Sequence, residues 1–450
     1  MFLVLKYLKM VSPVILQHRK YFDFIDAAHY CLPWFRSIRS QCPLKDELPT
    51  LTFPAIRFLQ DVIGKDSRVF EYGAGGSSMF FGKRVKELVS VEHDKTWFET
   101  TKIAMQDLQR QFGTQWTGIL AEAEPHNPPA DGSPADPLAY TSADEKFAGQ
   151  TFHRYVEAID AYPDEYFDVV LIDGRARPSC FLHAMTKVKI GGYVILDNAE
   201  RDSYAYIEET AEKLGFEKRE FWGPGPYNHY CWRTIFLQRS VTNFALNDLD
   251  KKLSRYLDFD GGTFIEAGAN DGIRQSNSLY FEMERGWRGV LVEAIPALYE
   301  QCRRHRPRAK VVWAALGAPE QVPGTARLRY AGLMSVVKGE MKSAGEEDAH
   351  ILAGCETQKL NTYEVDVPYA TLSSVLDQCG ISKVDLLSLD VEGMESRVLE
   401  GLDFERHAPA YILVEARYRD DIEKALGARY EVIDVLSHHD VLYRLRSGQS

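Results

Sequence analysis

Two short segments of this chain combine glycines and carboxylates at a spacing that suits a nucleoside ligand. Residues 71–78 run from an acid into a glycine-rich loop, and Glu92 ends the next expected strand. Residues 266–272 repeat the plan, followed by Glu293. A glycine loop before a helix lets a ligand approach the backbone, and the later carboxylate can accept hydrogen bonds from ribose hydroxyls. The doubled pattern predicts two nucleoside-binding domains in one polypeptide.

The acids before the loops narrow the class of ligand. Neither loop has the three-glycine spacing of a dinucleotide site: Ser78 occupies the third position in one, and Gly268 and Gly272 are too far apart in the other. A carboxylate directly before the loop, at Glu71 or Glu266, would repel a pyrophosphate and suits a cationic ligand such as a sulfonium or an amino-acid ammonium. The pattern therefore disfavours a nicotinamide-dependent oxidoreductase.

This combination resembles class I S-adenosylmethionine-dependent methyltransferases in both halves of the chain. In that family the acidic glycine loop surrounds the methionine part of the cofactor, and the acid that ends the second strand binds the ribose. The resemblance implies cofactor contacts at Glu71, Gly73, Gly75, Glu92, Glu266, Gly268, Asn270, Gly272 and Glu293. A loop that merely turns the chain is the structural alternative for each copy.

The second half has a sharper resemblance, to the FkbM family of methyltransferases. The matching strings are 268–272, 276–280 and 389–395, which lie within residues 262–417. Many members have Glu-Pro where this chain has Glu293-Ala294-Ile295-Pro296, and this difference leaves the carboxylate in place. The resemblance implies O-methylation of hydroxyl groups on sugars or polyketide-like metabolites.

Two carboxylates of the second half are candidate catalytic groups. Asp390 and Glu392 follow an expected strand at the edge of the sheet where ligands bind in open α/β folds. Methyl transfer depends on in-line positioning, and an alcohol acceptor also needs a base within hydrogen-bond reach. The structural alternative is that both acids cap the helix expected near Met394. His438 and His439 are weaker base candidates, expected in a surface turn.

In the first half, Asp173 closes one expected strand, and Asp197 and Asn198 close the next. This arrangement resembles the divalent-cation site of catechol-type O-methyltransferases. Hard oxygen ligands would suit Mg²⁺, which would orient a hydroxyl and lower its pKa. Substrate binding or helix capping by Asn198 explains the same residues equally well. Asp173 is the candidate catalytic residue of this half, and Arg175 and Arg177 beside it could clamp an anionic substrate.

Alternating strands and helices must position these residues. Apolar runs such as 169–172 require a sheet buried on both faces. Helices are expected over 96–108, 203–214 and 247–257. Strands are expected at 68–72, 88–92, 116–121, 167–173, 192–197 and 234–238, and again at 263–267, 289–293, 310–315, 384–390, 411–415 and 430–435. The pattern predicts two Rossmann-like, doubly wound, mostly parallel α/β sheets in tandem, the class I methyltransferase fold.

The predicted domains are a helical lead-in over 1–40, a class I methyltransferase-like domain over 41–240 and an FkbM-like domain over 241–450. A proline-rich stretch at 122–142 is expected to be a surface insertion or a lid. A second insertion, 317–361, should include a hairpin near 327–330 and 363–367. The aromatic stretch 221–230 is either a substrate wall or a packed turn.

Composition limits the partners and the compartment. The net charge of −12 makes a nucleic-acid partner unexpected, and the basic run 303–308 is interpreted as a solvated face. Seven scattered cysteines without a CxxC pair indicate neither zinc nor disulfides, which favours a reducing, cytoplasmic compartment. Residues 1–10 are apolar but broken by lysines, which predicts an amphipathic docking helix and no transmembrane segment.

These observations predict a tandem methyltransferase that uses S-adenosylmethionine in each domain, with Mg²⁺ as the candidate metal of the first. The expected acceptors are hydroxyl groups of a small molecule, glycan, glycolipid or secondary metabolite. One active domain beside a degenerate partner is an alternative. A non-catalytic protein that uses both folds as scaffolds or cofactor sensors is another.

Overall fold

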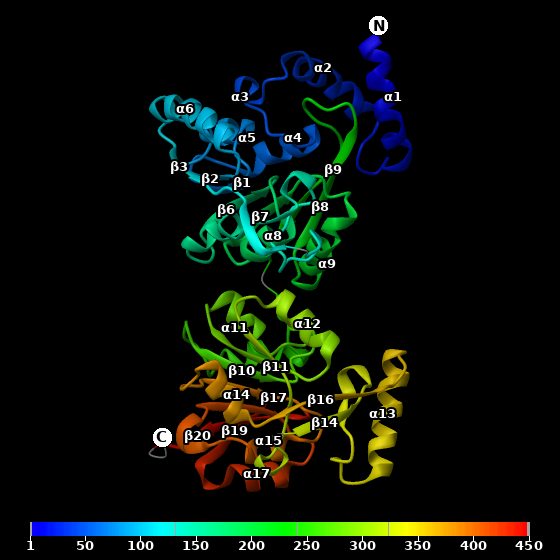
Figure 1. Cartoon of the computed structure of the whole chain (residues 1–450), viewed down its shortest axis with the longest axis vertical. Coiled ribbons are helices and arrows are strands. Elements are labelled where there is room, and N and C mark those ends of the chain that lie inside the picture. Colours follow the sequence, from blue (N-terminus) through cyan, green and yellow to red (C-terminus); the bar gives the residue numbers. More distant parts are fainter. Residues whose placement is uncertain (1, 131, 241, 323, 448–450) are drawn as a thin grey trace. The chain divides into compact units, whose positions relative to one another are not determined.

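The chain forms two compact units, Met1–Val241 and Thr242–Ser450. In Figure 1 the first runs from blue to green and the second from green to red. The computed structural model describes residues 2–130, 132–240, 242–322 and 324–447. Each unit has its own seven-stranded sheet. The two units are therefore described separately.

The N-terminal sheet has the strand order β3-β2-β1-β6-β7-β9-β8. Its strands pair in parallel except β9, which is antiparallel to both β7 and β8. The strands are β1 (Arg68–Tyr72), β2 (Glu87–Glu92), β3 (Gln115–Leu120), β6 (Phe167–Ile172), β7 (Val188–Leu196), β8 (Glu217–Pro224) and β9 (Cys231–Gln238). Because β1 and β6 lie at the centre, their carboxyl ends form the edge that carries the first glycine loop.

The C-terminal sheet repeats this order as β12-β11-β10-β17-β18-β20-β19, with β20 antiparallel to β18 and β19. The strands are β10 (Thr263–Ala267), β11 (Arg288–Glu293), β12 (Lys310–Trp313), β17 (Leu386–Leu389), β18 (Tyr411–Glu415), β19 (Tyr430–Val435) and β20 (Asp440–Leu445). Successive residues of β10 face different cores: Ile265 packs in one hydrophobic cluster and Phe264 in another. The predicted fold class, two Rossmann-like, mostly parallel α/β sheets in tandem, is confirmed.

Helices connect the strands in both units. In the N-terminal unit they are α1 (Phe2–Gln17), α2 (Phe24–Ser40), α3 (Pro43–Asp46), α4 (Phe53–Val62), α5 (Gly76–Gly82), α6 (Lys95–Phe112), α7 (His153–Glu157), α8 (Arg177–Ala184) and α9 (Ala205–Lys213). In the C-terminal unit they are α10 (Leu249–Leu253), α11 (Leu279–Glu284), α12 (Pro296–His305), α13 (Ala344–Gln358), α14 (Leu372–Cys379), α15 (Glu395–Glu400), α16 (Phe404–His407) and α17 (Arg419–Leu426).

Two predictions about the helices have different outcomes. Helices α6 and α9 contain most of the residues expected at 96–108 and 203–214. The helix expected at 247–257 is shorter, because Asn247 and Asp248 both have a φ of 55°, in the left-handed region that a right-handed helix excludes. Among the described residues, no helix is long and apolar enough to cross a membrane.

A small sheet forms part of the second insertion. Its order is β13-β16-β14-β15, with bounds β13 (Ala315–Leu316), β14 (Gly324–Arg329), β15 (Val336–Val337) and β16 (Glu364–Ala370). The expected hairpin is confirmed, since β14 and β16 pair antiparallel from Arg329 opposite Glu364 to Gly324 opposite Tyr369. Helix α13 lies beside this sheet in Figure 1. In the N-terminal unit, β4 (Glu124–Ala130) and β5 (Gly149–Thr151) form a separate antiparallel pair.

Phe221, Trp222 and Asn228 of the aromatic stretch 221–230 are packed within the N-terminal unit, which supports the alternative of a packed turn. Trp222 stacks on His18 with ring centroids 3.7 Å apart, and Phe221 stacks on Phe58. The carbonyl of Asn228 accepts a hydrogen bond from the Trp34 indole at 2.8 Å. These contacts join β8 and the turn after it to the helices before the sheet.

Candidate functional sites

A cavity of about 260 Å³ opens at the carboxyl edge of the C-terminal sheet. Its wall includes six residues predicted from the sequence: Glu266, Gly268, Asn270, Glu293, Asp390 and Glu392. The insertion supplies another part of the wall through Leu328, Leu333, Ser335 and Val337. The structure therefore brings the predicted cofactor contacts and the predicted catalytic acids of this half to one cavity.

Glu293 holds the backbone of the glycine loop. One carboxylate oxygen accepts a hydrogen bond from the Asn270 amide at 2.8 Å, and the other accepts one from the Ile295 amide at 2.7 Å. Burial raises the pKa of Glu293 to about 7, although these amide hydrogen bonds oppose the rise. The acid that ends the second strand thus fixes the loop beside the cavity.

The loop conformation requires a glycine at position 268. Gly268 has a φ of 81°, and a Cβ atom there would clash with the carbonyl oxygen of Asp390. Asn270 is also left-handed, with a φ of 51°, which asparagine tolerates better than most residues. Gly272 lies outside the cavity wall, at a φ of 82° beside Arg306 and Cys302.

Glu266 fixes the segment that follows the loop. Its carboxylate accepts hydrogen bonds from the hydroxyls of Ser276 at 2.7 Å and Ser278 at 2.5 Å. The backbone amide of Asn277 donates to the other oxygen at 2.7 Å. These bonds occupy both carboxylate oxygens, so Glu266 determines the shape of the loop region from within the protein.

The interpretation of the basic run 303–308 as a solvated face is wrong for two of its residues. Arg306 is fully buried and His305 is 6% exposed. The Arg306 guanidinium donates to the Glu282 carboxylate at 2.8 Å and to the Gly272 carbonyl at 2.8 Å. A buried charge needs such partners, because desolvation of an unpaired guanidinium would cost several kcal/mol. Arg306 therefore ties α12 to the loop that follows β10.

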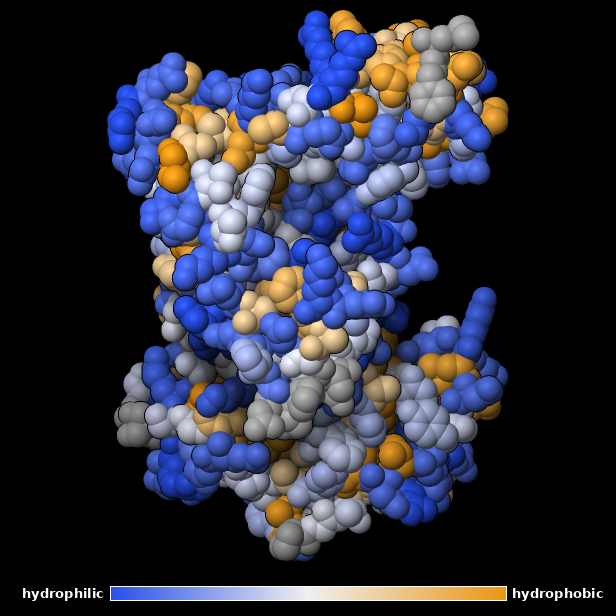
Figure 2. All heavy atoms as spheres, turned by 45° about the horizontal axis from the view of Figure 1, so that its top comes forward, coloured by the Kyte–Doolittle hydropathy of each residue, from blue (hydrophilic) through white to orange (hydrophobic). Residues whose placement is uncertain are grey.

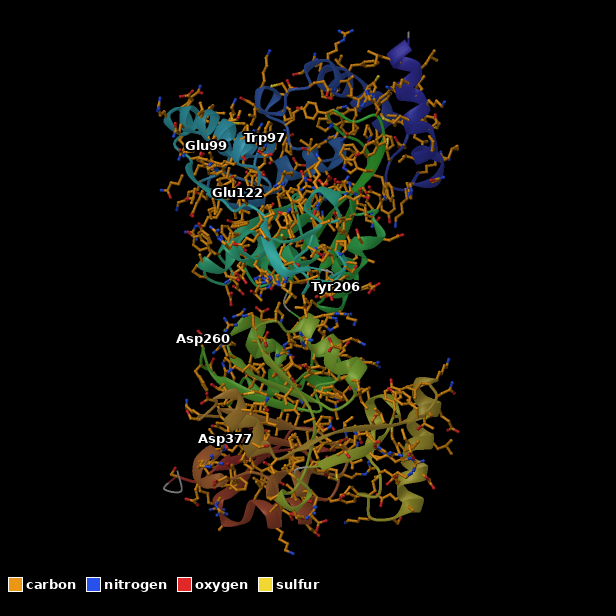
Figure 3. The ribbon with its side chains drawn as sticks, in the orientation of Figure 1. Trp97, Glu99, Glu122, Tyr206, Asp260 and Asp377 are labelled. Atoms are coloured by element: carbon orange, nitrogen blue, oxygen red, sulfur yellow. The ribbon has the colours of Figure 1, made fainter. Side chains whose placement is uncertain are left out.

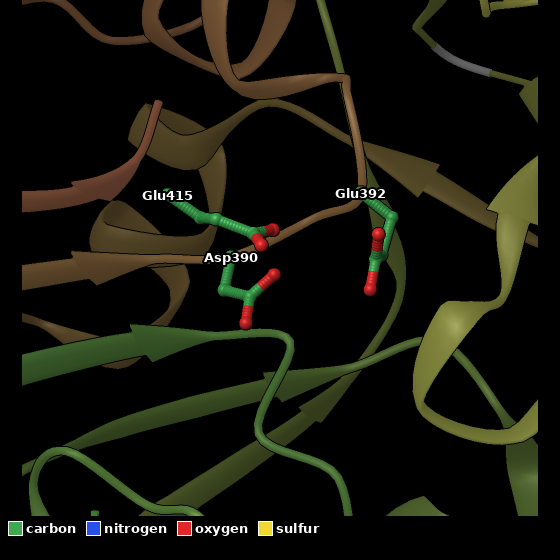
Figure 4. A group of neighbouring side chains, drawn as sticks. All are labelled: Asp390, Glu392 and Glu415. Carbon is green, nitrogen blue, oxygen red and sulfur yellow. The ribbon is translucent and has the colours of Figure 1, made fainter. Parts of the chain in front are cut away.

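Three carboxylates lie close together in the wall of the same cavity. Asp390, Glu392 and Glu415 each offer an oxygen within 4.8 Å of the others, and Figure 4 shows the three side chains converging from two neighbouring strand ends. Burial raises the pKa of Asp390 well above its ordinary value, and the charges of Glu415 and Glu392 add to the rise. A hydrogen bond between the Asp390 carboxyl group and Glu415 contributes to the same rise.

Glu415 was missed in the sequence analysis. The signal was its position at the end of the strand expected at 411–415, which is a neighbour of the Asp390 strand in a parallel sheet. Side-chain convergence depends on strand order, and the sequence does not state that β17 and β18 are adjacent.

Glu392 has positively charged or titratable neighbours that the other two acids lack. The His350 imidazole lies 3.2 Å from its carboxylate, and the Arg417 guanidinium lies 3.6 Å away. His350 comes from α13, so the insertion contacts the carboxylate cluster directly. These two contacts orient the Glu392 carboxylate.

The capping alternative for Asp390 and Glu392 is wrong. Helix α15 begins after Met394 without a side-chain cap. The loop before it is held by Glu395, whose carboxylate accepts hydrogen bonds from the amides of Gly393 at 2.9 Å and Val391 at 3.2 Å. The two earlier acids are left to face the cavity. His438 and His439 are exposed in the turn between β19 and β20, as expected.

The N-terminal unit repeats the clamp on its glycine loop. Glu92 accepts a hydrogen bond from the Ala74 amide at 3.0 Å, and its second oxygen accepts from the amides of His93 and Asp94. The Trp97 indole, labelled in Figure 3, donates to the Ala74 carbonyl at 2.6 Å. Gly73 and Gly75 have φ values of 104° and 158° on either side of Ala74. Glu92 corresponds in position and contact to Glu293.

Glu71 lies beneath the loop and is fully buried. Its carboxylate accepts hydrogen bonds from the hydroxyls of Ser90, at 2.6 Å, and Ser78. The Ser78 hydroxyl in turn accepts from the Gly75 amide at 2.9 Å. Burial raises the pKa of Glu71 to about 7, against the lowering effect of the serine hydroxyls. Glu71 therefore positions the loop through Ser78.

The residues proposed for Mg²⁺ are engaged with protein groups. The Asp197 carboxylate accepts hydrogen bonds from the Trp232 indole at 2.8 Å and the Thr234 hydroxyl at 2.7 Å, and burial raises its pKa to about 8. The Asp173 carboxylate pairs with Arg177 at 3.2 Å, and burial raises its pKa to about 6. A guanidinium between two such acids disfavours a divalent cation. This donor set does not support the Mg²⁺ prediction.

Asn198 does not cap a helix. It has a φ of 50°, and the short helical turn that follows, Asp202–Tyr204, begins after Arg201 instead. Its position at the end of β7 places it next to Asp197 at the edge of the sheet.

A second cavity, of about 240 Å³, lies at the carboxyl end of β6 in the N-terminal unit. Three arginines line it, Arg175, Arg177 and Arg201. Thr141, Ser142 and Asp144, which border the proline-rich insertion, form the facing wall. Gly174 also lines the cavity, and its Cα would lie 3.4 Å from a Cβ placed on Gly73. The cavity therefore adjoins the first glycine loop.

Residues 266–447 match the family model of the methyltransferase FkbM domain. No curated protein matches the chain. The solved structures similar to it include an O-methyltransferase from Bacillus cereus in complex with SAH, at 13% identity and a TM-score of 0.31, covering 45% of this chain and 91% of that one.

They also include a methyltransferase-like protein from Silicibacter pomeroyi, at 20% identity and a TM-score of 0.28, covering 44% of this chain and 92% of that one. The precorrin 8w decarboxylase of Methanobacterium thermoautotrophicum has 15% identity and a TM-score of 0.28, and the match covers 43% of this chain and 92% of that one. The family match coincides with the cavity that holds Glu293 and Asp390. Within the C-terminal unit, residues 266–447 are thus similar to the methyltransferase FkbM domain.

Proposed function

We propose that the C-terminal unit transfers a methyl group from S-adenosylmethionine to a hydroxyl group of a small molecule or glycan. The observation that carries this proposal is the continuity of one cavity from the Glu293 clamp to the carboxylates at Asp390, Glu392 and Glu415. When bound, S-adenosylmethionine supplies an electrophilic methyl group on a sulfonium. The chain's own residues would bind it, position the acceptor and remove the acceptor's proton.

The Glu293 end of the cavity suits the nucleoside. The carboxylate has lone pairs beyond its two bonds to the loop amides, and these can accept hydrogen bonds from ribose hydroxyls. Ile295, Leu298 and Ala315 give the same wall an apolar surface for a planar base. The loop is already held by Glu293 and Gly268, so little ordering is required when the ligand binds.

The carboxylate end suits the acceptor. Burial and the neighbouring charges raise the pKa of Asp390, which makes its carboxylate a stronger base than an ordinary one, and Glu415 lies beside it. The pair would take the hydroxyl proton as the methyl group transfers. Glu392, oriented by Arg417 and His350, would accept hydrogen bonds from other hydroxyls of the acceptor.

We propose a second cofactor site in the N-terminal unit, formed by Gly73, Gly75, Glu92 and Trp97. Its support is the clamp of Glu92 on Ala74, which repeats that of Glu293 on Asn270. Asp173, with a pKa of about 6, is the candidate base there. The alternatives are a degenerate N-terminal unit that binds no cofactor, and a protein that senses the cofactor without catalysis.

A cytoplasmic location is supported by seven cysteines that form no disulfide.

Calorimetric titration with S-adenosylmethionine tests both sites. We expect two sites in the wild type, one lost in Glu92→Ala and the other in Glu293→Ala, each with an affinity lowered about a hundredfold because charged hydrogen bonds to ribose are removed. Glu99→Ala and Glu300→Ala, both exposed carboxylates on α6 and α12, are matched controls. A wild type that binds no S-adenosylmethionine contradicts the proposal, and a single site lost only in Glu293→Ala supports the degenerate N-terminal unit.

A further inference from the structure

The cavity of the N-terminal unit carries an excess of positive charge. Arg175, Arg177 and Arg201 line it, and the carboxylates paired with them are Asp144 and Asp173. The chain as a whole has a net charge of −12. We propose that this cavity binds an anionic group, a phosphate or a carboxylate, carried by the acceptor of the N-terminal unit. That the anion belongs to a methyl acceptor rests on the proposed function, whereas the anion site itself requires no cofactor.

Arg201 is the group that remains available to a ligand. Among the described contacts, its guanidinium makes no hydrogen bond and no ion pair, and its closest aromatic neighbour is the Tyr204 ring, 5.9 Å away. The residue is exposed and immediately precedes the helical turn Asp202–Tyr204. A guanidinium with free donors can bind two oxygens of a phosphate or carboxylate at once.

Arg177 lies at the base of the cavity and is held by protein groups. Arg177 is nine-tenths buried and donates to the Asp173 carbonyl at 2.8 Å and the Gly174 carbonyl at 3.1 Å. Its guanidinium also lies 5.3 Å from the Tyr204 ring. These contacts fix the positive charge of Arg177 at the base of the cavity, where the side chain is buried.

Arg175 closes the opposite side. One terminal nitrogen pairs with Asp144 at 3.1 Å, and Nε donates to the His93 imidazole at 3.2 Å. The Ser142 hydroxyl lines the cavity beside Asp144 and can donate to an anion, whereas the Thr141 hydroxyl donates to the Gly132 carbonyl at 3.0 Å. The acids that compete with a bound anion are therefore Asp144 and Asp173.

The position of the cavity links the anion to the reaction. Gly174 belongs to its wall and lies against Gly73 of the glycine loop. An acceptor anchored by its anionic group at Arg201 would place another part of the molecule beside that loop. Anchoring by a remote charged group is an effective way to orient a reacting hydroxyl.

The test is calorimetric titration of the full chain with inorganic phosphate and, separately, with acetate. We expect binding of at least one of these anions that weakens about tenfold or more in Arg201→Ala, because a bidentate charged contact is lost. Asp173→Asn should tighten binding, since a competing carboxylate is removed. Arg219→Ala, an exposed arginine on β8 with an aromatic contact to Phe58, is the matched control.

The two anions distinguish the sources of the ligand: tighter binding of phosphate assigns a phosphoryl group, and tighter binding of acetate a carboxylate. Equal affinity of wild type and Arg201→Ala, or no binding of either anion, overturns the inference. Titration of the same proteins with S-adenosylmethionine separates the two proposals. Anion binding without cofactor binding refutes the proposed function alone, and cofactor binding without anion binding refutes the anion site alone.

A different observation supports a second inference, about the outer face of α1 and α2. Six large apolar side chains there are at least half exposed to solvent: Leu5, Leu8, Leu16, Phe24, Ile25 and Leu32. Figure 2 shows hydrophobic residues gathered at the top right, where Figure 1 places these helices. A patch of this kind on a protein surface commonly marks a binding face.

The opposite faces of the two helices are packed. Tyr7 and Val11 of α1 and Trp34 of α2 are buried, and the Tyr7 hydroxyl donates to the Ala27 carbonyl at 2.7 Å. The exposed apolar residues recur at helical spacing, as at Leu8 and Leu16, so each helix has a second apolar stripe. The core of the unit accounts for the first stripe only.

Charge identifies the partner of this face. Residues 1–40 contain six lysines and arginines against two aspartates, whereas the chain as a whole is acidic. Basic residues beside an apolar stripe are typical of helices that lie in the interface of an anionic membrane. We infer that α1 and α2 dock the protein on an anionic lipid surface.

Co-sedimentation of the full chain with vesicles tests this inference. We expect binding to vesicles of phosphatidylcholine with phosphatidylglycerol, reduced by salt and at least tenfold weaker in a Leu8→Ser, Leu16→Ser, Ile25→Ser variant. Ile103→Ser, at an exposed position of α6, is the matched control. Unchanged binding in the triple variant overturns the inference. So does self-association that the triple variant abolishes without any vesicle binding, because the face would then join two copies of the chain.

Discussion

The carboxylate pair in the C-terminal cavity gives the most direct test of the proposed chemistry. Glu415→Gln removes the negative charge beside Asp390 while it keeps the shape of the side chain. Burial and the charge of Glu415 raise the pKa of Asp390, so the loss of that charge should lower the pKa. Asp390 would then release its proton at a lower pH than in the wild type.

The size of the change follows from the geometry. The oxygens of the cluster lie within 4.8 Å of one another. Two unit charges at that separation interact by about 3.5 kcal/mol at an effective dielectric constant of about 20. Asp390 faces an open cavity, and water there screens roughly half of this energy. The remaining ~1.7 kcal/mol is the preference for protonated Asp390 that Glu415→Gln removes, so the pKa of Asp390 should fall.

Infrared difference spectroscopy over a pH titration measures this change without an acceptor. The carbonyl band of a protonated carboxyl group disappears as the group ionises, and Asp390→Asn identifies the band that belongs to Asp390. We expect its midpoint to move to lower pH in Glu415→Gln and to stay in place in Glu300→Gln, an exposed acid on α12. A midpoint that is the same in Glu415→Gln and the wild type would refute the effect of Glu415 on the pKa of Asp390 and the assignment of the base.

Four further outcomes are expected. Gly268→Ala should abolish cofactor binding to the C-terminal unit in calorimetry, because a Cβ clashes with the Asp390 carbonyl and the φ of 81° is strained. The pKa of about 7 at Glu71 means that its contribution to folding is full below about pH 4.5 and is lost by pH 7, a fall of about 3 kcal/mol. Denaturant melts of Glu71→Gln should therefore vary less with pH than those of the wild type. EDTA should leave the thermal midpoint of the protein and any activity of the N-terminal unit unchanged, because Arg177 lies between Asp173 and the Asp197 backbone; a loss of activity that Mg²⁺ restores would revive the metal site. Trp97→Ala should weaken cofactor binding by the N-terminal unit alone, read by the same titration, since its indole supports the Ala74 carbonyl.

The sequence predicted the strands that form the centre of each sheet. Strands β1, β10 and β18 begin and end at the predicted residues, because their apolar runs are bounded by polar residues and turns. Strand β8 was missed. Its first residues, Glu217 to Arg219, are exposed and charged, and it lies at the edge of the sheet, where one strand needs no continuous apolar run.

The candidate sites were predictable only in part. Glu92 and Glu293 were predictable as neighbours of the glycine loops, because the strand that each ends pairs with the strand before its loop. Glu415 and His350 reach the cavity from distant segments, so their role depends on strand order and on how the insertion folds back. Arg306 illustrates the opposite error: a charge run in the sequence contains no sign that one of its members pairs with a buried glutamate.

The C-terminal cavity has two walls, one from the sheet edge and one from the insertion between β13 and β16. The sheet edge supplies Glu293 and the glycine loop, and the insertion supplies Leu333, Ser335 and, through α13, the imidazole that contacts Glu392. Substitutions in the insertion can therefore change which acceptor is methylated without altering the contacts to the nucleoside. Selection on acceptor choice could act on this segment alone, so related chains are expected to diverge most there while the sheet edge stays constant.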